Sequence, residues 1–106
     1  MSVKLTLLKS GETIISDVKE LVYDTSESSE KEVYGYLLQQ PKKVNMSSPV
    51  FLTEETTEES SVQVSLTSWC LITKDTEFAI PSDWIVTIME PVDRLTKMYE
   101  ESLNGV

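Results

Sequence analysis

The N-terminal residues 3–23 contain two runs of strand-forming residues separated by a short polar break. In the first run, Val3, Leu5 and Leu7 alternate with polar residues, which is the two-residue period of a strand with one buried face. The break, Lys-Ser-Gly-Glu, includes Gly11, which can adopt the positive φ of a tight turn. The pattern therefore predicts a β-hairpin.

The second run of this hairpin changes its alternation partway along. Ile14, Ser16 and Val18 share one parity, whereas Leu21 and Tyr23 take the other. Such a switch indicates either a β-bulge with a sharp bend or a strand that is buried on both faces. A long, bent second strand is what a small closed or nearly closed β-barrel requires, and the rest of the chain can complete that barrel.

The middle of the chain predicts a further strand with an interruption. Residues 33–38 and 42–46 are either one strand with a bulge at Pro41 or two short strands. Gly35 indicates a bend or the close approach of another backbone.

Three more segments complete the predicted sheet. Residues 62–66 alternate between apolar and polar, and residues 78–80 form a short strand. Residues 84–89 are apolar on both parities, as expected for a strand covered on two sides. Residues 68–73, which include Trp69, Leu71 and Ile72, are expected to form a buried continuation or corner, with Cys70 as a small buried apolar residue.

A single helix is predicted at the C-terminal end, over residues 91–104. Pro91 suits the first turn of a helix, and Asp93 complements the positive end of its dipole. The apolar residues that recur at helical spacing are Val92, Leu95, Met98, Tyr99 and Leu103. The 106 residues are expected to form one domain.

The net charge of −9 is unevenly distributed along the chain. Residues 24–32 and 53–61 carry −3 and −4 of it, and both segments are polar enough to predict flexible acidic loops. The folded body is then nearly neutral, so the total charge alone does not exclude a nucleic-acid ligand.

The residue inventory argues against an enzyme. Histidine is absent, which excludes a Cys-His or Ser-His nucleophile, and no zinc-binding cysteine pair, P-loop or dinucleotide motif is present. The single cysteine excludes an internal disulfide and fits a reducing compartment. No apolar run approaches the roughly 20 residues of a membrane helix. The sequence therefore predicts a non-catalytic protein without a cofactor, metal or membrane span.

One polar cluster suggests nucleic-acid binding. Lys42, Lys43 and Asn45 follow shortly after Tyr34 and Tyr36, and single-stranded nucleic acid is bound by basic groups and stacking aromatic rings together. The alternative is that the lysines are solubilising surface charges and the tyrosines belong partly to the core.

Residues 7–18, with the sequence Leu-Leu-Lys-Ser-Gly-Glu-Thr-Ile-Ile-Ser-Asp-Val, resemble the first motif of the Sm-like (LSm) family. Residues 78–86 fall where the second motif of that family would lie. With residues 91–95 and the closing helix, the chain resembles the small Sm-like proteins carried by marine cyanophages. The resemblance implies a strongly bent five-stranded Sm-like (SH3-like) barrel. The C-terminal helix is a departure, because typical members carry theirs before the barrel.

The resemblance also implies a homo-oligomeric ring, from pentamer to heptamer, that acts on single-stranded RNA as a binding or chaperone module. The expected location is the cytoplasm, or the host cytoplasm if the protein is phage-encoded. Asp24 matches the acidic position after the second strand, but the Asn expected shortly after it is missing. Residues 81–83, Pro-Ser-Asp, replace the Arg-Gly pair of the last tight turn, which removes a phosphate partner.

Two functions therefore remain open. The first is RNA binding, with Asp24, Tyr34, Tyr36, Lys42, Lys43 and Asn45 as the candidate residues. The alternative is a protein-interaction or structural ring that has lost the usual Sm RNA site and whose partners are phage or host proteins.

Overall fold

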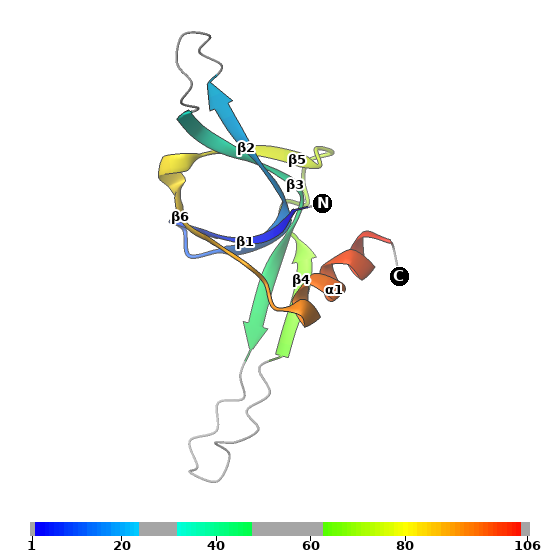
Figure 1. Ribbon diagram of the computed structural model, residues 1–106. Helices are drawn as coiled ribbons and strands as arrows, with labels where there is room; N and C mark the ends of the chain where they lie inside the picture. The colour runs from blue at the N-terminus through cyan, green and yellow to red at the C-terminus, as the bar shows by residue number, and fades with distance from the viewer. Residues whose placement is uncertain (1, 24–31, 48–62, 105–106) are drawn as a thin grey trace.

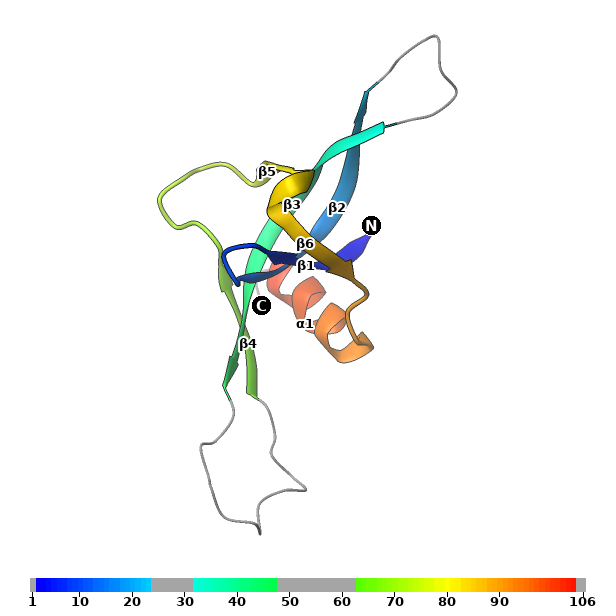
Figure 2. The same cartoon turned by 90° about the vertical axis from the view of Figure 1, so that its left-hand side faces the viewer.

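The computed structural model describes residues 2–23, 32–47 and 63–104, which form a mainly β structure with one C-terminal helix (Figures 1 and 2). The elements are β1 (Val3–Leu8), β2 (Thr13–Tyr23), β3 (Glu32–Ser47), β4 (Gln63–Ser68), β5 (Glu77–Pro81), a 3-10 turn (Ser82–Trp84), β6 (Ile85–Met89) and α1 (Asp93–Leu103). All strand pairs are antiparallel. The mainly β class and the single C-terminal helix agree with the prediction from the sequence.

β1 and β2 form the predicted N-terminal hairpin. Val3 pairs with Asp17 and Leu7 with Thr13. Gly11 has a φ of 92° in the turn, and its N–H donates a hydrogen bond of 2.9 Å to the carbonyl oxygen of Leu8. The left-handed conformation explains why a glycine occupies this position.

The ladder between β2 and β3 contains two irregularities. The register of β2 against β3 shifts between Ile15 and Asp17 and again between Leu21 and Val22. At each shift β3 has one extra residue, so both are β-bulges, which bend and twist the strands. Residues 14–16 are also buried on both faces. Of the two alternatives suggested by the sequence, burial on both faces therefore holds for residues 14–16, whereas the bulges lie on the neighbouring strand β3 and not on β2 as predicted.

β3 is one continuous strand with a kink at Gln40 and Pro41. Gln40 has a φ of 51°, and its N–H donates to the carbonyl oxygen of Thr76 at 2.6 Å. β5 pairs with residues 35–39 and β4 with residues 42–47, so Pro41 lies between the two ladders, where its missing N–H breaks no pairing. The single strand with a proline-marked bulge is confirmed.

The sheet has the order β4-β3-β2-β1-β6. β4 and β5 share the outer edge of β3, where β5 pairs with its N-terminal half and β4 with its C-terminal half. It curls so that β1 and β6 lie opposite β2 and β5 (Figure 1). Leu8, Ile14 and Leu38 are buried inside the curl, and Ile80 of β5 and Ile85 of β6 pack against them. Both ends of the sheet therefore reach one core. Within the described residues no register joins β6 to β5 or β4, so the sheet is open.

Gly35 permits the close approach of β5 to β3 inside this curl. A Cβ atom at this position would lie 2.8 Å from the carbonyl oxygen of Ile80, closer than real Cβ contacts. The predicted close backbone contact at Gly35 is confirmed.

A second core lies between the outer face of the sheet and α1. Ile15 and Val44 of the sheet pack against Leu95 and Tyr99 of the helix, and all four are buried. The helix begins at Asp93 rather than at residue 91. Val92 precedes the helix and is 70% exposed. The prediction that Val92 belongs to the packed apolar face of the helix is therefore wrong.

The predicted burial of residues 68–73 is wrong for Cys70, Leu71 and Ile72, whereas Trp69 is partly buried. Cys70 is exposed, and Leu71 and Ile72 are 84% and 95% exposed. β4 ends at Ser68, and in the connection to β5 only Trp69 packs against the inner core. The chain has left the sheet at this point, so its apolar side chains have no layer to pack against.

The predicted covering of residues 84–89 on both sides is also wrong. Val86 is 58% exposed and Met89 39% exposed. Trp84 lies in the 3-10 turn and is 46% exposed. β6 is the last strand of the sheet, and its inner face alone packs on the core.

Other predictions concern parts of the chain that are not described. The acidic loops 24–32 and 53–61 lie outside the described residues, apart from Glu32, which begins β3. Among the residues described, no helix is both long and apolar enough to cross a membrane.

Candidate nucleic-acid interface

An exposed pair of tyrosines lies at the end of the β2–β3 hairpin. The ring centroids of Tyr23 and Tyr34 are 4.5 Å apart, with an interplanar angle of 36°. Tyr23 is 54% exposed and Tyr34 44% exposed. Tyr34 is the extra residue of the second bulge, which allows its ring to meet that of Tyr23. The pair offers aromatic surface on which a base could stack.

This part of the hairpin projects from the body of the sheet (Figures 1 and 2). β1 pairs with β2 only as far as Asp17, and β5 pairs with β3 only from Gly35 onward. The tyrosine pair therefore sits on a two-stranded arm. Tyr34 was a candidate residue from the sequence, whereas Tyr23 was missed, because only the register of the bulge shows that the two rings meet.

Tyr36 has a different environment. It is partly buried and packs against the inner core of Leu8, Ile14 and Leu38. It pairs with Glu20 on one side and Ile80 on the other. The interpretation of a core tyrosine therefore fits Tyr36, and that of a stacking residue fits Tyr34.

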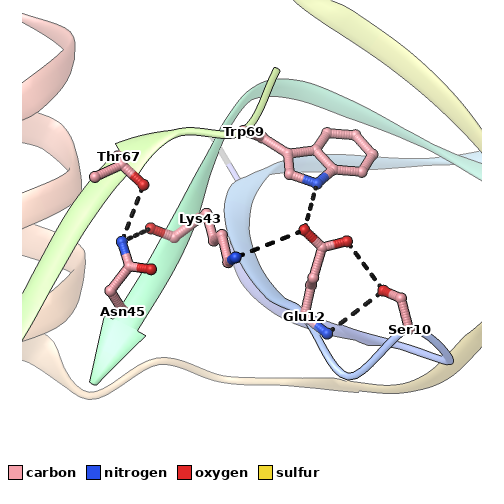
Figure 3. A network of polar contacts seen from close by, with 6 residues as sticks. All are labelled: Ser10, Glu12, Lys43, Asn45, Thr67 and Trp69. Atoms are coloured by element: carbon pink, nitrogen blue, oxygen red, sulfur yellow. Dashed lines mark hydrogen bonds and ion pairs between the residues drawn. The ribbon is translucent and has the colours of Figure 1, made fainter. Parts of the chain in front are cut away.

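Lys43 belongs to a polar network at the opposite end of β3 (Figure 3). Its Nζ lies 4.0 Å from Oε2 of Glu12, which also accepts a 3.3 Å hydrogen bond from Nε1 of Trp69. Ser10 donates to the other oxygen of Glu12 at 3.0 Å. The hairpin turn, β3 and the end of β4 thus converge on one carboxylate. The side chain of Lys43 is still 42% exposed, so its charge is balanced but open to solvent.

Asn45 lies on the same face of the β3–β4 ladder as Lys43. Its Nδ2 donates to Oγ1 of Thr67 at 2.9 Å, and Thr67 is the cross-strand partner of Lys43. Val44, between them, is buried under α1 on the other face. This face therefore presents an ammonium group, an amide and a hydroxyl together, which are groups that can bind phosphate and base edges.

Lys42 points to the other face of β3, since neighbouring side chains in a strand alternate. It lines a cavity of about 290 Å³ at the kink, together with Gln40, Pro41 and residues of the β4–β5 connection and the end of α1. The basic doublet of the sequence is therefore divided between two faces.

The candidate residues form two groups and not one site. Tyr34 and Lys43 are nine residues apart on β3, on either side of the kink at Gln40, which is a separation of at most about 30 Å along the strand. One nucleotide cannot contact both, whereas a chain of several nucleotides can. Asp24 lies outside the described residues.

Tyr99 is the buried ionisable group with a perturbed pKa. Burial raises the pKa of its hydroxyl to about 12. The hydroxyl donates to the main-chain carbonyl oxygens of Gln39 and Gln40, at 3.1 and 2.9 Å. It therefore holds the kink of β3 against α1, which is a structural role. In the described ranges, no group of three Asp, Glu or Cys side chains could hold a metal ion.

Comparison with known protein families gives a match over nearly the whole chain. Residues 1–104 match the model of a group described as "Family of unknown function (DUF6561)". No curated protein sequence matches the chain.

Proposed function

The chain belongs to DUF6561, a family of unknown function, and we propose that it is an Sm-like protein that forms a homo-oligomeric ring and binds single-stranded RNA without catalysis. The curled antiparallel sheet supports an Sm-like barrel, because both of its ends, β6 and β5, reach one core and the ladder between β2 and β3 is bulged. The proposed setting is the one implied by the resemblance, a phage protein acting in the cytoplasm of its host.

The observation that carries ring formation is a pair of free edges, one on β6 at one end of the sheet and one on β5 at the other end, where the outer edge of β4 is also unpaired in the described residues. β6 pairs with β1 on one edge, and β5 pairs with β3 on one edge; neither pairs on its other edge within the described ranges. Both strands are five residues long. Exposed strand edges favour pairing with another chain. Because the two edges belong to different strands, β5 of one copy can pair with β6 of the next, and such a head-to-tail contact produces rings when its rotation closes.

The RNA ligand is supported by the two groups of side chains along β3. The Tyr23–Tyr34 pair offers stacking surface, and the face with Lys43 and Asn45 offers a cation and hydrogen-bonding groups. Single-stranded nucleic acid is bound by this combination of stacking and charge. A ring would repeat both groups in every copy, which would increase the apparent affinity for an RNA that reaches several copies.

Native mass spectrometry and fluorescence anisotropy test the two halves of this proposal separately. Native spectra over a range of protein concentrations should show a single closed species of five to seven copies. Anisotropy with short U-rich and A-rich RNAs, over a salt series, should show saturable binding that weakens as salt rises. A monomer at every concentration would reject the ring, and the lack of saturable binding at low salt would reject the RNA ligand.

A ring that binds proteins instead of RNA is the second candidate. It is favoured by the ion pair between Glu12 and Lys43, because the carboxylate already balances the charge that would bind phosphate. It is also favoured by the exposed Asp83 in the last turn, whose negative charge would repel phosphate. Affinity capture from host lysate, with and without nuclease, distinguishes the two. Partners that survive nuclease support the protein-binding ring, and partners lost on digestion support RNA.

A further inference from the structure

The connection between β4 and β5 carries two adjacent apolar side chains that are almost fully exposed. Leu71 is 84% exposed and Ile72 is 95% exposed. An isolated exposed Leu or Ile is ordinary on a protein surface, but two adjacent ones form a small apolar patch that favours a contact. Residues 73–76 join this pair to β5, whose outer edge is unpaired in the described structure.

A second exposed apolar pair lies at the end of β6, which also has an unpaired edge in the described residues. Met89, the last residue of β6, is 39% exposed, and Val92, three residues later, is 70% exposed. Leu71 and Ile72 therefore precede the N-terminal end of β5, whereas Met89 and Val92 lie at and just after the C-terminal end of β6. Within one copy, the 3-10 turn joins the C-terminal end of β5 to the N-terminal end of β6, so the two apolar pairs lie at the strand ends that the turn does not join.

Antiparallel pairing between copies would bring these pairs together. All strand pairs in the sheet are antiparallel, and in an antiparallel pair the first residue of one strand lies beside the last residue of the other. If β5 of one copy pairs in this way with β6 of the next, Glu77 lies near Met89 of the neighbouring copy. The connection before Glu77 then lies near Val92 of that copy.

We propose that Leu71 and Ile72 dock on Met89 and Val92 of a neighbouring copy and so fix the direction and register of the contact between copies. This inference rests on the proposed ring and deepens it, because backbone pairing alone does not specify register. A five-residue edge can slip by one or two positions, whereas an apolar contact at one end stabilises one alignment. The partner of this surface is therefore a second copy of the chain.

Cys70, which is exposed beside Leu71, provides a direct test by crosslinking. Two variants that retain Cys70 are made, Val92→Cys and Ser82→Cys, and each is treated with a short bismaleimide crosslinker. Both replaced residues are exposed, so neither variant should disturb the fold. Ser82 lies in the turn that precedes β6, at the end opposite Val92.

The docking predicts a ladder of covalent oligomers for Val92→Cys and none for Ser82→Cys. The unmodified protein and the Cys70→Ser/Val92→Cys variant should give no ladder, since each then has only one of the two thiols of the contact. A ladder from Ser82→Cys in place of Val92→Cys would show parallel pairing and overturn the inference. Crosslinked dimers of the unmodified protein would do so as well, because they would show a symmetric contact.

Removal of the apolar pair provides an independent measurement. The Leu71→Ser/Ile72→Ser variant should need at least a 10-fold higher protein concentration for half-maximal assembly. Each of the two substitutions removes an aliphatic side chain that the docking would bury at every contact between copies. Met46→Ser is the control, because Met46 is 65% exposed on β3 and lies on neither β5 nor β6. Unchanged assembly together with no Val92→Cys ladder would overturn the docking while leaving a ring seen by native mass spectrometry intact. A protein that is monomeric in those spectra would reject the ring itself.

Discussion

The hydroxyl of Tyr99 donates a hydrogen bond of 2.9 Å to the main-chain carbonyl oxygen of Gln40, the residue that adopts a φ of 51° in the kink of β3. Positive φ is unfavourable for a residue with a side chain and persists where neighbouring groups hold it. The N–H of Gln40 is also bound, to the carbonyl oxygen of Thr76. The C-terminal helix thus stabilises an irregular point in a strand about 60 residues earlier in the chain.

Replacement of Tyr99 by Phe should destabilise the protein by about 1 to 3 kcal/mol, because two main-chain carbonyl groups lose their donor while the ring still fills the core. Urea denaturation at neutral pH, followed by circular dichroism, measures this difference. Tyr23→Phe is the matched control, since Tyr23 is exposed and should tolerate the loss of its hydroxyl. Equal stabilities of the two variants would show that the hydroxyl does not hold the kink.

Stability should also fall between about pH 10 and pH 12 through the titration of Tyr99. Its pKa is raised by burial from 10.0 to about 12 in the folded protein. Above pH 10 the unfolded chain loses this proton while the folded protein retains it, so unfolding becomes more favourable as pH rises. Denaturation midpoints of the wild type and Tyr99→Phe should converge over this range. Parallel pH profiles would contradict the assignment.

Gly35→Ala should destabilise the fold by about 1 to 3 kcal/mol, the range for overpacking in a well-packed region. The new Cβ would lie 2.8 Å from the carbonyl oxygen of Ile80, so β5 would have to move. Thermal denaturation of this variant is compared with that of Thr87→Ala, an exposed position on β6. Gly35→Ala should have a lower melting temperature than the wild type, whereas Thr87→Ala should melt at the wild-type temperature.

Glu12→Gln should strengthen RNA binding and make it more sensitive to salt. The carboxylate of Glu12 balances the charge of Lys43, and its removal frees that cation for phosphate. One additional phosphate contact steepens the salt dependence of log K by about 0.7 for a single strand. The double variant Glu12→Gln/Lys43→Gln should abolish this gain. A gain that survives without Lys43 would indicate a different cause.

Tyr34→Leu should weaken binding of single-stranded RNA by about 1 to 3 kcal/mol, the range for loss of one stacked base. Tyr34→Phe should retain the affinity, because it keeps the aromatic face. The salt dependence should stay the same in both variants, since no charge changes. Anisotropy titrations at two salt concentrations separate this effect from that of the lysines. Equal affinities of the Leu and Phe variants would rule out stacking at this position.

Local sequence patterns predicted the strands and the helix well. The alternation around Gly11 defined the first hairpin, whereas the parity switch in β2 placed in that strand the bulges that lie on its partner β3. Pro41 marked the kink of β3, although the sequence left open whether one strand or two would result. These features depend on neighbouring residues in the chain, which is why the sequence contains them.

Burial and side-chain partners were harder to predict, because they depend on which segments meet. Leu71 and Ile72 look like core residues by type, but the chain around them has left the sheet. The contact of Lys43 with Glu12 depends on the register between β2 and β3. In the same way, the meeting of Tyr23 and Tyr34 depends on one bulge. No property of the separate residues specifies these contacts.

The change of partners at Pro41 also restricts how this part of the chain can vary in length during evolution. Beyond Pro41, β3 pairs with β4, with Val44 toward α1 and Lys43 and Asn45 on the opposite face. Insertion or deletion of a single residue just after Pro41 would exchange these faces, exposing Val44 and placing a lysine under the helix. Changes of two residues, matched in β4, would keep every side chain on its own side. Family members should therefore differ here by even numbers of residues.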